Sequence, residues 1–461
     1  SDPDQFELAL EDLETAMAVV HAEEDAEDRA AKRPAKPRAA NRGSLPKHLP
    51  RIEQIIDVHD KTCPCCRGEL HAMGEDVSER LDIVPAQFRV IVTRRPKYAC
   101  RACEEVVVQA PVPARLVEGG IPTEATVAHV LVSKYADHLP LYRQAQIYGR
   151  QGVNLDRSTL ADWVGKAAFL LRPVHERLFE RLKASTKLFA DETTAPVLDP
   201  GRGRTKTGQF FAYARDERPW GGADPPGVAY LYAPDRKAEQ PIRHLQGFAG
   251  VLQVDGYAGY NTLAGKNAVS LAFCWSHVRR KFYDLAQGGP APIASEALLR
   301  IAELYRIEGD IRGCPAEERR NVRQTRSRPL VAALEPWLQG KLGLVSQKSK
   351  LAEAIRYALS RWAGLSRFLH DGRVEIDSNR VESAIRPIAL NRKNALFAGS
   401  DGGAEHWAVI ASLVETSKLN GADPQAYLVD VITRIVAGHP QSQIDDLLPW
   451  AYASLPLKAV A

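Results

Sequence analysis

The sequence lacks the features of membrane and secreted proteins. No apolar run reaches the roughly 18 residues that a membrane-spanning helix needs, and the first residues carry neither a basic nor an apolar signal segment. The seven cysteines are odd in number and clustered, which is a poor basis for a disulfide framework. We therefore expect a protein of the reducing cytoplasm with no membrane partner. Because the chain begins with Ser1, its natural start is expected upstream.

The net charge of +4 is too small to indicate a partner, but the charges are unevenly placed. Residues 1–28 hold eleven acids and no Lys or Arg, whereas residues 29–51 hold eight Lys or Arg and no acid. A four–three spacing of apolar residues from Phe6 to Val20 predicts an acidic amphipathic helix, which either docks on its own domain or forms a short coiled coil. The basic, proline-containing stretch is predicted to be an extended linker, which is either only solvated or follows DNA phosphates.

Four cysteines form two C-x-x-C pairs within residues 52–118. Each pair can direct two thiolates at one ion, and together they complete the tetrahedron of a structural Zn²⁺ site. Short β-like stretches such as Phe88–Val92 are expected around them, and Cys65 is the spare cysteine. The alternative is a set of reduced core cysteines. The predicted zinc ligands are Cys63, Cys66, Cys100 and Cys103.

Residues 119–184 are predicted to be helical. One helix covers 140–148, a turn with glycines covers 149–155, and Asp156 or Ser158 is expected to cap the next helix. Two helices joined in this way suit a helix-turn-helix-like DNA-binding region. A plain packing pair is the alternative, because many enzymes contain such helices.

Residues 185–400 show the element order of an RNase H-like catalytic core. Strands are predicted at 186–193, 208–213, 227–232, 250–255 and 268–273, with a helical stretch at 238–247 and a basic helix at 274–282. In that arrangement Asp191 lies at the end of the central first strand and Asp255 ends the fourth strand beside it. Glu382 follows on a later helix, where Asn379 and Arg386 share its face.

Three carboxylates suit phosphodiester chemistry, because two Mg²⁺ or Mn²⁺ ions bound by carboxylate oxygens polarise the phosphate, activate the nucleophile and stabilise the leaving oxygen. Each acid also has a plain interpretation as a cap or turn residue, and Glu192 and Asp377 are rivals of their neighbours. His277 lies three positions after Cys274; packing or a position near phosphate is favoured for it over a second metal site. The residues predicted to contact DNA are Arg279, Arg280, Lys281, Asn379, Arg386, Arg392 and Lys393.

Long, ordered motifs extend through nearly the whole chain. They make the sequence similar to the large bacterial family of insertion-sequence transposases numbered sixty-six. The motifs are 11–14 (EDLE), 63–66 (CPCC), 74–79 (GEDVSE), 95–103 (RPKYACRAC), 139–142 (LPLY), 190–193 (ADET), 255–260 (DGYAGY), 277–282 (HVRRKF) and 392–400 (RKNALFAGS).

The resemblance implies a multidomain α/β protein with a zinc-binding β domain, a helical DNA-binding region and a DDE core that carries a helical insertion. The expected boundaries are 1–28, 29–51, 52–118, 119–184, 185–400 with an insertion at about 288–372, and a helical region at 401–461. It also selects Asp191, Asp255 and Glu382 as the catalytic triad. Ser378 and Ser383 depart from the usual pattern, in which Asn and Arg stand.

The activity that the resemblance implies is cleavage of insertion-sequence ends and transfer of the freed strand to target DNA. The expected partners are terminal inverted repeats, target DNA, further copies of the chain and accessory proteins of the same element. Two alternatives stay open. One is an inactive DNA-binding regulator, and the other is a nuclease of the same fold without strand transfer.

Overall fold

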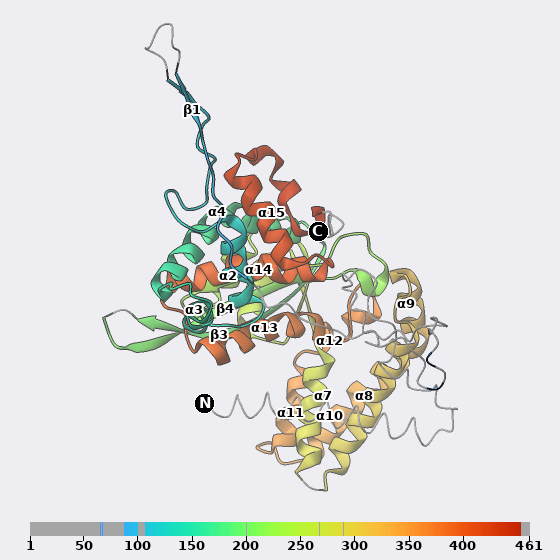
Figure 1. Cartoon of the computed structure of the whole chain (residues 1–461). Helices are drawn as coiled ribbons and strands as arrows, with labels where there is room; N and C mark the ends of the chain where they lie inside the picture. Colours follow the sequence, from blue (N-terminus) through green and yellow to red (C-terminus); the bar gives the residue numbers. More distant parts are fainter. Residues whose placement is uncertain are drawn as a thin grey trace. The chain divides into compact units, whose positions relative to one another are not determined.

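The computed structural model describes residues 65, 67, 87–99, 107–199, 201–266, 268–288 and 290–452. The chain divides into two compact units, residues 1–87 with 457–461, and residues 88–456, and nearly all of the described residues belong to the second unit. Within its described residues the second unit is a mixed α/β structure with a helical majority (Figure 1). The acidic helix at 1–28, the linker at 29–51 and the four predicted zinc ligands lie outside the described residues.

A five-stranded mixed sheet forms the centre of this unit, in the order β5-β4-β3-β6-β7. The strands β3, β4 and β5 pair antiparallel, whereas β6 and β7 continue from β3 in parallel. The predicted strand order is thus confirmed, with β3 central and β6 beside it. The bounds are β3 Lys187–Asp199, β4 Arg204–Arg215, β5 Gly227–Ala233, β6 Gly250–Val254 and β7 Val269–Phe273.

The prediction that the first strand ends at its acids is wrong. Strand β3 runs eight residues past Asp191, to Asp199, which pairs with Arg204 at the end of the β3–β4 hairpin. The hairpin reaches beyond the shorter strands (Figure 1). Its outer part gains a further backbone partner, because Leu198 donates an N–H to the carbonyl of Ala398 at 2.8 Å. Cross-strand pairing therefore continues where the apolar sequence pattern stops.

Helices α4 (Arg157–Lys183) and α14 (Asp401–Leu419) pack on the sheet and share its core. Helix α14 also covers the edge strand β5. The N–H of Tyr230 donates to the hydroxyl of Ser412 at 2.8 Å, and that of Val228 donates to Thr416 at 3.1 Å. An uncovered edge strand would offer these groups to another chain. Helix α14 is therefore built into the core of the sheet.

The residues predicted as a helical insertion, between the fourth-strand acid and Glu382, form helices that share an apolar core. Ile301, Leu304 and Ile307, spaced three residues apart, lie buried on one face of α8. The core includes α7, whose Trp275 side chain donates to the carbonyl of Leu365 at 2.9 Å. The bounds are α7 Trp275–Gln287, α8 Pro292–Asp310, α9 Ala316–Val322, α10 Arg328–Leu344, α11 Lys350–Leu359 and α12 Trp362–Leu365, with a π-helical turn η2 at Arg323–Ser327.

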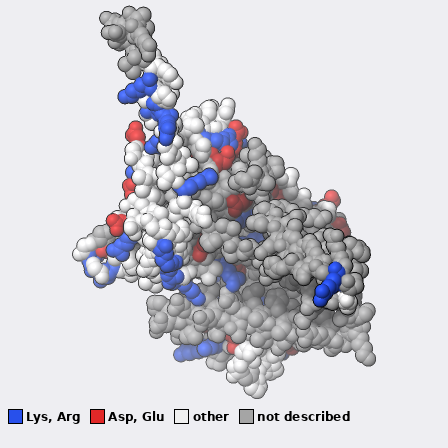
Figure 2. Space-filling view, viewed as in Figure 1, with Lys and Arg blue, Asp and Glu red and all other residues white. Residues whose placement is uncertain are grey.

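The segment before the sheet has a two-stranded ribbon, β1 (Lys97–Ala99) with β2 (Val107–Gln109). Residues 88–92 form no strand, contrary to expectation; their apolar side chains are exposed, and the ring of Phe88 contacts that of Tyr148 edge-on. Lys and Arg side chains gather along this ribbon (Figure 2); among its described residues they include Arg94, Arg95 and Lys97.

The helices predicted at 119–184 are α2 (Glu124–Tyr135), α3 (Leu141–Arg150) and the long α4. Asp156 precedes α4 at the cap position, but its side chain makes no cap hydrogen bond. The remaining elements are α5 Glu239–His244, α6 Ala258–Lys266, α13 Asn379–Ala395 and α15 Pro424–Val436, with the 3₁₀ turns η1 Arg218–Trp220, η3 Arg367–Leu369, η4 Gln441–Leu447 and η5 Pro449–Ala451. Across the described residues, every helix is too short or too polar to cross a bilayer.

Candidate active site

Asp191 and Asp255 come from the two adjacent parallel strands at the middle of the sheet. The register pairs Phe189 with Gln253; Asp191 lies two positions further along β3, and Asp255 lies two positions after Gln253, one residue beyond the end of β6. The register therefore brings the two acids level. One ligand oxygen of each, together with one of Glu192, lie within 4.8 Å of one another.

The surroundings of Asp191 favour a cation beside it. Burial raises the pKa of this carboxyl well above its usual range, and the charges of Asp255, Glu192 and Glu382 raise it further. The N–H of Glu192 donates to Asp191 Oδ1 at 2.8 Å and opposes the shift. A bound cation would remove the repulsion among these acids. Titratable groups with such shifts are frequent at functional sites.

Glu192 differs from its neighbour because its charge already has partners. Its carboxylate forms an ion pair with Arg236 and accepts a hydrogen bond from the hydroxyl of Tyr260 at 3.1 Å. Burial raises the pKa of Glu192, while the contact with Arg236 lowers it. Geometry therefore admits Glu192 as a third ligand, but its partners compete for the same oxygens.

Asp255 stands at a turn that the insertion helps to hold. The N–H of Tyr257 donates to Asp255 Oδ1 at 3.0 Å. From α11, Tyr357 donates its hydroxyl to the carbonyl of Asp255 at 2.8 Å, and Arg361, just after that helix, donates to the carbonyl of Gly256 at 3.2 Å. Gly256 has a φ of 117°, a conformation that other residues rarely adopt.

Glu382 lies in the first turn of α13, as predicted, but it is grouped differently from the other two acids. Its carboxylate accepts a hydrogen bond from the hydroxyl of Ser378 at 2.8 Å and lies 3.8 Å from Nδ1 of His277. Its ligand atom lies within 4.8 Å of those of Cys274 and His277. Its charge nevertheless reaches Asp191, whose pKa it helps to raise.

The segment that leads into α13 is held by side chains that the sequence analysis missed. Gln253, fully buried on β6, donates to the carbonyls of Glu375 at 2.7 Å and Asp377 at 2.8 Å. Arg319 of α9 makes two hydrogen bonds to the carboxylate of Glu375, at 2.8 and 2.9 Å. A glutamine inside an otherwise apolar strand was the available signal, because a buried amide needs partners.

Asp377, the rival of Glu382, lies just before α13. Its carboxylate accepts hydrogen bonds from the backbone N–H of Asn379 at 3.3 Å and from the Asn379 side chain at 3.0 Å. Burial is the main cause that raises the pKa of Asp377 to about 6. Asn379, a predicted DNA contact, is thus engaged with Asp377 here.

The other predicted DNA contacts lie on α7 and α13. Arg279 lies 5.9 Å from the ring of Tyr283, and Lys281 lies 4.7 Å from that of Tyr357. Arg392 donates to the hydroxyl of Thr194 on β3 at 3.0 Å, so it ties α13 to the sheet. Helix α13 continues through Pro387 to Ala395. Arg280 lies half-buried on α7, and Arg386 and Lys393 are exposed on α13.

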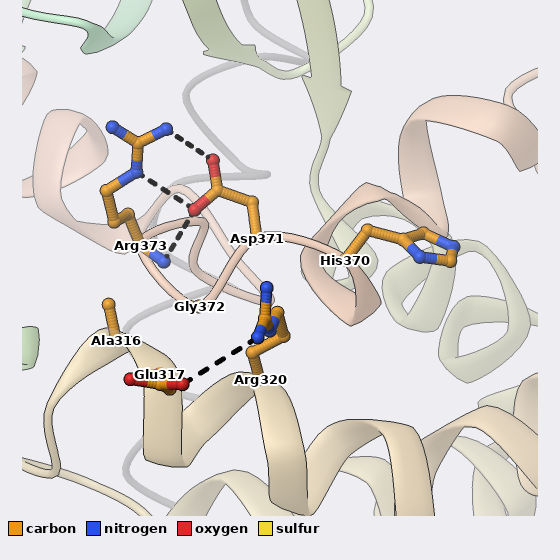
Figure 3. Close-up of a pocket in the computed structure, with 7 residues that line it drawn as sticks. All are labelled: Ala316, Glu317, Arg320, His370, Asp371, Gly372 and Arg373. Atoms are coloured by element: carbon orange, nitrogen blue, oxygen red, sulfur yellow. Dashed lines mark hydrogen bonds and ion pairs between the residues drawn. The ribbon is translucent and has the colours of Figure 1, made fainter.

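A cavity of about 490 Å³ lies between α9 and the loop after η3. Its lining includes none of Asp191, Asp255 and Glu382. Figure 3 shows Arg373 turned toward Asp371 and Arg320 toward Glu317. The basic groups that line it thus already have acidic partners. We assign no chemistry to this cavity.

Comparison with protein families matches residues 119–406 to the Transposase IS66 family. Residues 60–104 match the zinc-finger binding domain of transposase IS66, which supports a structural zinc in that segment. Residues 412–450 match the IS66 C-terminal element, and residues 1–53 match the Transposase C of IS166 homeodomain. These matches indicate a DNA-binding protein of the transposase type.

Full-length relatives occur in Sinorhizobium fredii (strain NBRC 101917 / NGR234). The chain is 48% identical to "Uncharacterized protein y4jD" over 97% of its own length and 89% of the relative's. It is also 48% identical to "Uncharacterized protein y4qI", over 97% and 84%, and 39% identical to "Uncharacterized protein y4hP", over 97% and 84%. The resemblance seen in the motifs is therefore confirmed, and the chain belongs to the Transposase IS66 family.

Proposed function

We propose that this chain is a DNA transposase whose RNase H-like core uses Asp191, Asp255 and Glu382 to cleave insertion-sequence ends and join them to target DNA. The observation that carries the proposal is the convergence of Asp191 and Asp255 from adjacent parallel strands, with ligand oxygens within 4.8 Å. The strand order, with the first acid on the central strand, supports the RNase H-like assignment.

The donor set fits hard divalent cations. Carboxylate oxygens are the ligands that Mg²⁺ and Mn²⁺ prefer. Burial and the neighbouring carboxylates raise the pKa of Asp191, and a bound cation would relieve this repulsion. Bound there, a pair of such ions would polarise the scissile phosphate and lower the pKa of the attacking water or 3′-hydroxyl. Asp191 and Asp255 would hold the ions from the sheet, and Glu382 would complete the set from α13.

The remaining predicted assignments fit around this centre. Arg279, Arg280 and Lys281 on α7, with Arg386 and Lys393 on α13, would hold the flanking phosphates. Residues 52–118 would form the zinc domain, residues 119–184 the DNA-binding helices, residues 185–400 the catalytic core and residues 401–461 the helical end. The partners would be terminal inverted repeats, target DNA, further copies of the chain and accessory proteins.

The test is an assay on DNA that carries the element's ends, with Mg²⁺, comparing the wild type with Asp191→Asn. We expect metal-dependent cleavage and joined product from the wild type and neither from the variant. Asp430→Asn, on the surface of α15 where Asp430 pairs with Arg434, is the matched control and should cleave as the wild type does.

Each alternative function has its own outcome in this assay. End binding without any metal-dependent cleavage by the wild type would replace the proposal with a DNA-binding regulator. Cleavage without joined product would replace it with a nuclease. Cleavage that survives in Asp191→Asn would reject the assigned site.

A further inference from the structure

A second group of metal-binding side chains lies at the start of α7. Cys274 occupies the N-cap position, and His277 stands three residues later in the first turn. Side chains at these two positions of a helix converge, as in a capping box. Glu382 approaches from α13, and one ligand atom of each residue lies within 4.8 Å of the other two.

Two polar groups near this cluster in the chain make no hydrogen bond within the described residues. Nδ1 of His277 and the hydroxyl of Tyr305 on α8 are both buried, and neither makes a hydrogen bond. Burial and the charges of Cys274, Asp377 and Glu382 raise the pKa of Tyr305. Buried polar atoms without partners are rare, and an ion or ordered water that completes them is a frequent explanation.

Hydrogen bonds from Ser378 hold Cys274 and Glu382 in place. The N–H of Ser378 donates to the sulfur of Cys274 at 3.3 Å, while its hydroxyl donates to Glu382 at 2.8 Å. Ser378 thus orients two of the three proposed ligand side chains through its backbone N–H and its hydroxyl. Such supporting hydrogen bonds are typical of metal sites, where they fix ligand orientation.

We propose that Cys274, His277 and Glu382 form a binding site for a borderline transition-metal ion, of which Zn²⁺ is the best fit. A thiolate, an imidazole and a carboxylate suit Zn²⁺ and Co²⁺, whereas Mg²⁺ avoids sulfur and nitrogen. Three protein ligands leave a fourth position open for water. On binding, the thiol proton of Cys274 leaves to solvent and the S–H bond is replaced by a metal–sulfur bond.

The site shares Glu382 with the proposed catalytic centre. An ion bound by Cys274 and His277 would hold this carboxylate toward α7 and away from Asp191 and Asp255. Zn²⁺ would then act as a brake on Mg²⁺-dependent cleavage. This consequence depends on the proposed function, whereas binding of the ion itself does not.

Cobalt spectroscopy on the full chain tests the site without any measurement of cleavage. The protein is purified with zinc in its finger segment, which Co²⁺ displaces poorly because thiolate sites prefer zinc, and Co²⁺ is then titrated in. We expect a thiolate-to-cobalt absorption band in the near ultraviolet that saturates at about one equivalent, and Co²⁺ held by carboxylates alone contributes nothing to this band. Cys274→Ser should abolish that band, and His277→Ala should weaken binding by at least about 100-fold.

The controls separate this site from its surroundings. Cys314→Ser removes another free cysteine, in the insertion, and should leave the titration unchanged. Asp191→Asn should also keep the cobalt band although it disables the proposed cleavage, so failure of one proposal is distinguishable from failure of the other. No cobalt bound beyond the finger, or a band that persists in Cys274→Ser, would overturn the site. Because His277 is half-exposed, its variant also tests the site should Cys274→Ser fold poorly.

Discussion

Asp191 and Asp255 reach the site from the sheet, whereas Glu382 reaches it from a helix that begins far later in the chain. The first two are set by the backbone register of β3 and β6, which places them level. Glu382 depends on side chains instead, because Gln253 and Arg319 hold the segment before α13 and Ser378 holds the carboxylate.

This difference indicates that the position of Glu382 is less firmly fixed than those of Asp191 and Asp255. Backbone pairing in the middle of a sheet has one register, because a shift of one residue would turn every buried side chain outward. A helix start held by a few side-chain hydrogen bonds has fewer constraints. We therefore expect substitutions near the strand acids to remove chemistry and leave the fold intact, and substitutions around α13 to change stability and activity together.

The largest effect should come from a strand acid. Asp255→Asn removes a proposed metal ligand, and a bound metal ion supplies several kcal/mol of transition-state stabilisation, which corresponds to on the order of 10³-fold in rate. Metal-free stability should stay the same or rise, because one of the mutually repelling carboxylates is gone. End cleavage and thermal unfolding with a chelator measure the two. A variant that loses stability would contradict the contrast.

The second largest effect should come from the buried ion pair between Arg319 and Glu375, in the segment that leads into α13. Arg319→Ala leaves Glu375 largely buried without its partner, since the Glu375 side chain is only 18% exposed. Breaking such a pair costs about 3–5 kcal/mol, measurable by denaturant unfolding. The double variant Arg319→Met with Glu375→Leu removes both charges and should recover much of the loss. Equal losses in the single and double variants would show that the pair is not the cause.

Gln253→Ala should have an intermediate effect. It removes the side chain that links β6 to Glu375 and Asp377. The segment before α13, and with it Glu382, is then held less firmly, whereas the backbone pairing of β6 before Asp255 is unchanged. Loss of such a supporting contact typically lowers activity by about 10–100-fold. Gln253→Glu keeps the shape and the acceptor but not the donors, and should also be impaired. Cleavage at saturating Mg²⁺ close to the wild-type rate would reject this role.

The smallest effect concerns pH and Mg²⁺. The folded-state pKa of Asp191 is raised, so its contribution to metal-free stability is complete below the unfolded value of about 3.9 and is lost as pH rises through the folded pKa. Protons and Mg²⁺ compete for the same oxygens. The Mg²⁺-induced rise in Tm should therefore increase with pH, by a few °C between about pH 5 and 8, and it should vanish in Asp191→Asn. A rise that decreases with pH would contradict it.

The strands and the positions of Asp191 and Asp255 were predictable because their signals are local. Alternating and apolar runs predicted the five strands of the sheet. The position of Asp255 directly after an apolar run predicted that it would lie at the end of β6. The extension of β3 past Asp191 was missed, since its outer half is stabilised by β4 and Ala398 and not by an apolar pattern. The absence of a strand at 88–92 was missed because apolar β-branched residues predict a strand, whereas Val90, Ile91 and Val92 are exposed and unpaired with any described strand.

Local patterns thus decided the element types, the two strand acids and the family, because each of these depends on residues close together in the chain. Only the folded chain decided what surrounds them: Arg236 beside Glu192, Gln253 beside Glu375, and Cys274 beside Glu382. These partners are separated by tens to more than a hundred residues, and they meet because the sheet order and the helical insertion bring their segments together. The charge around each acid, and so the chemistry open to it, follows from that packing.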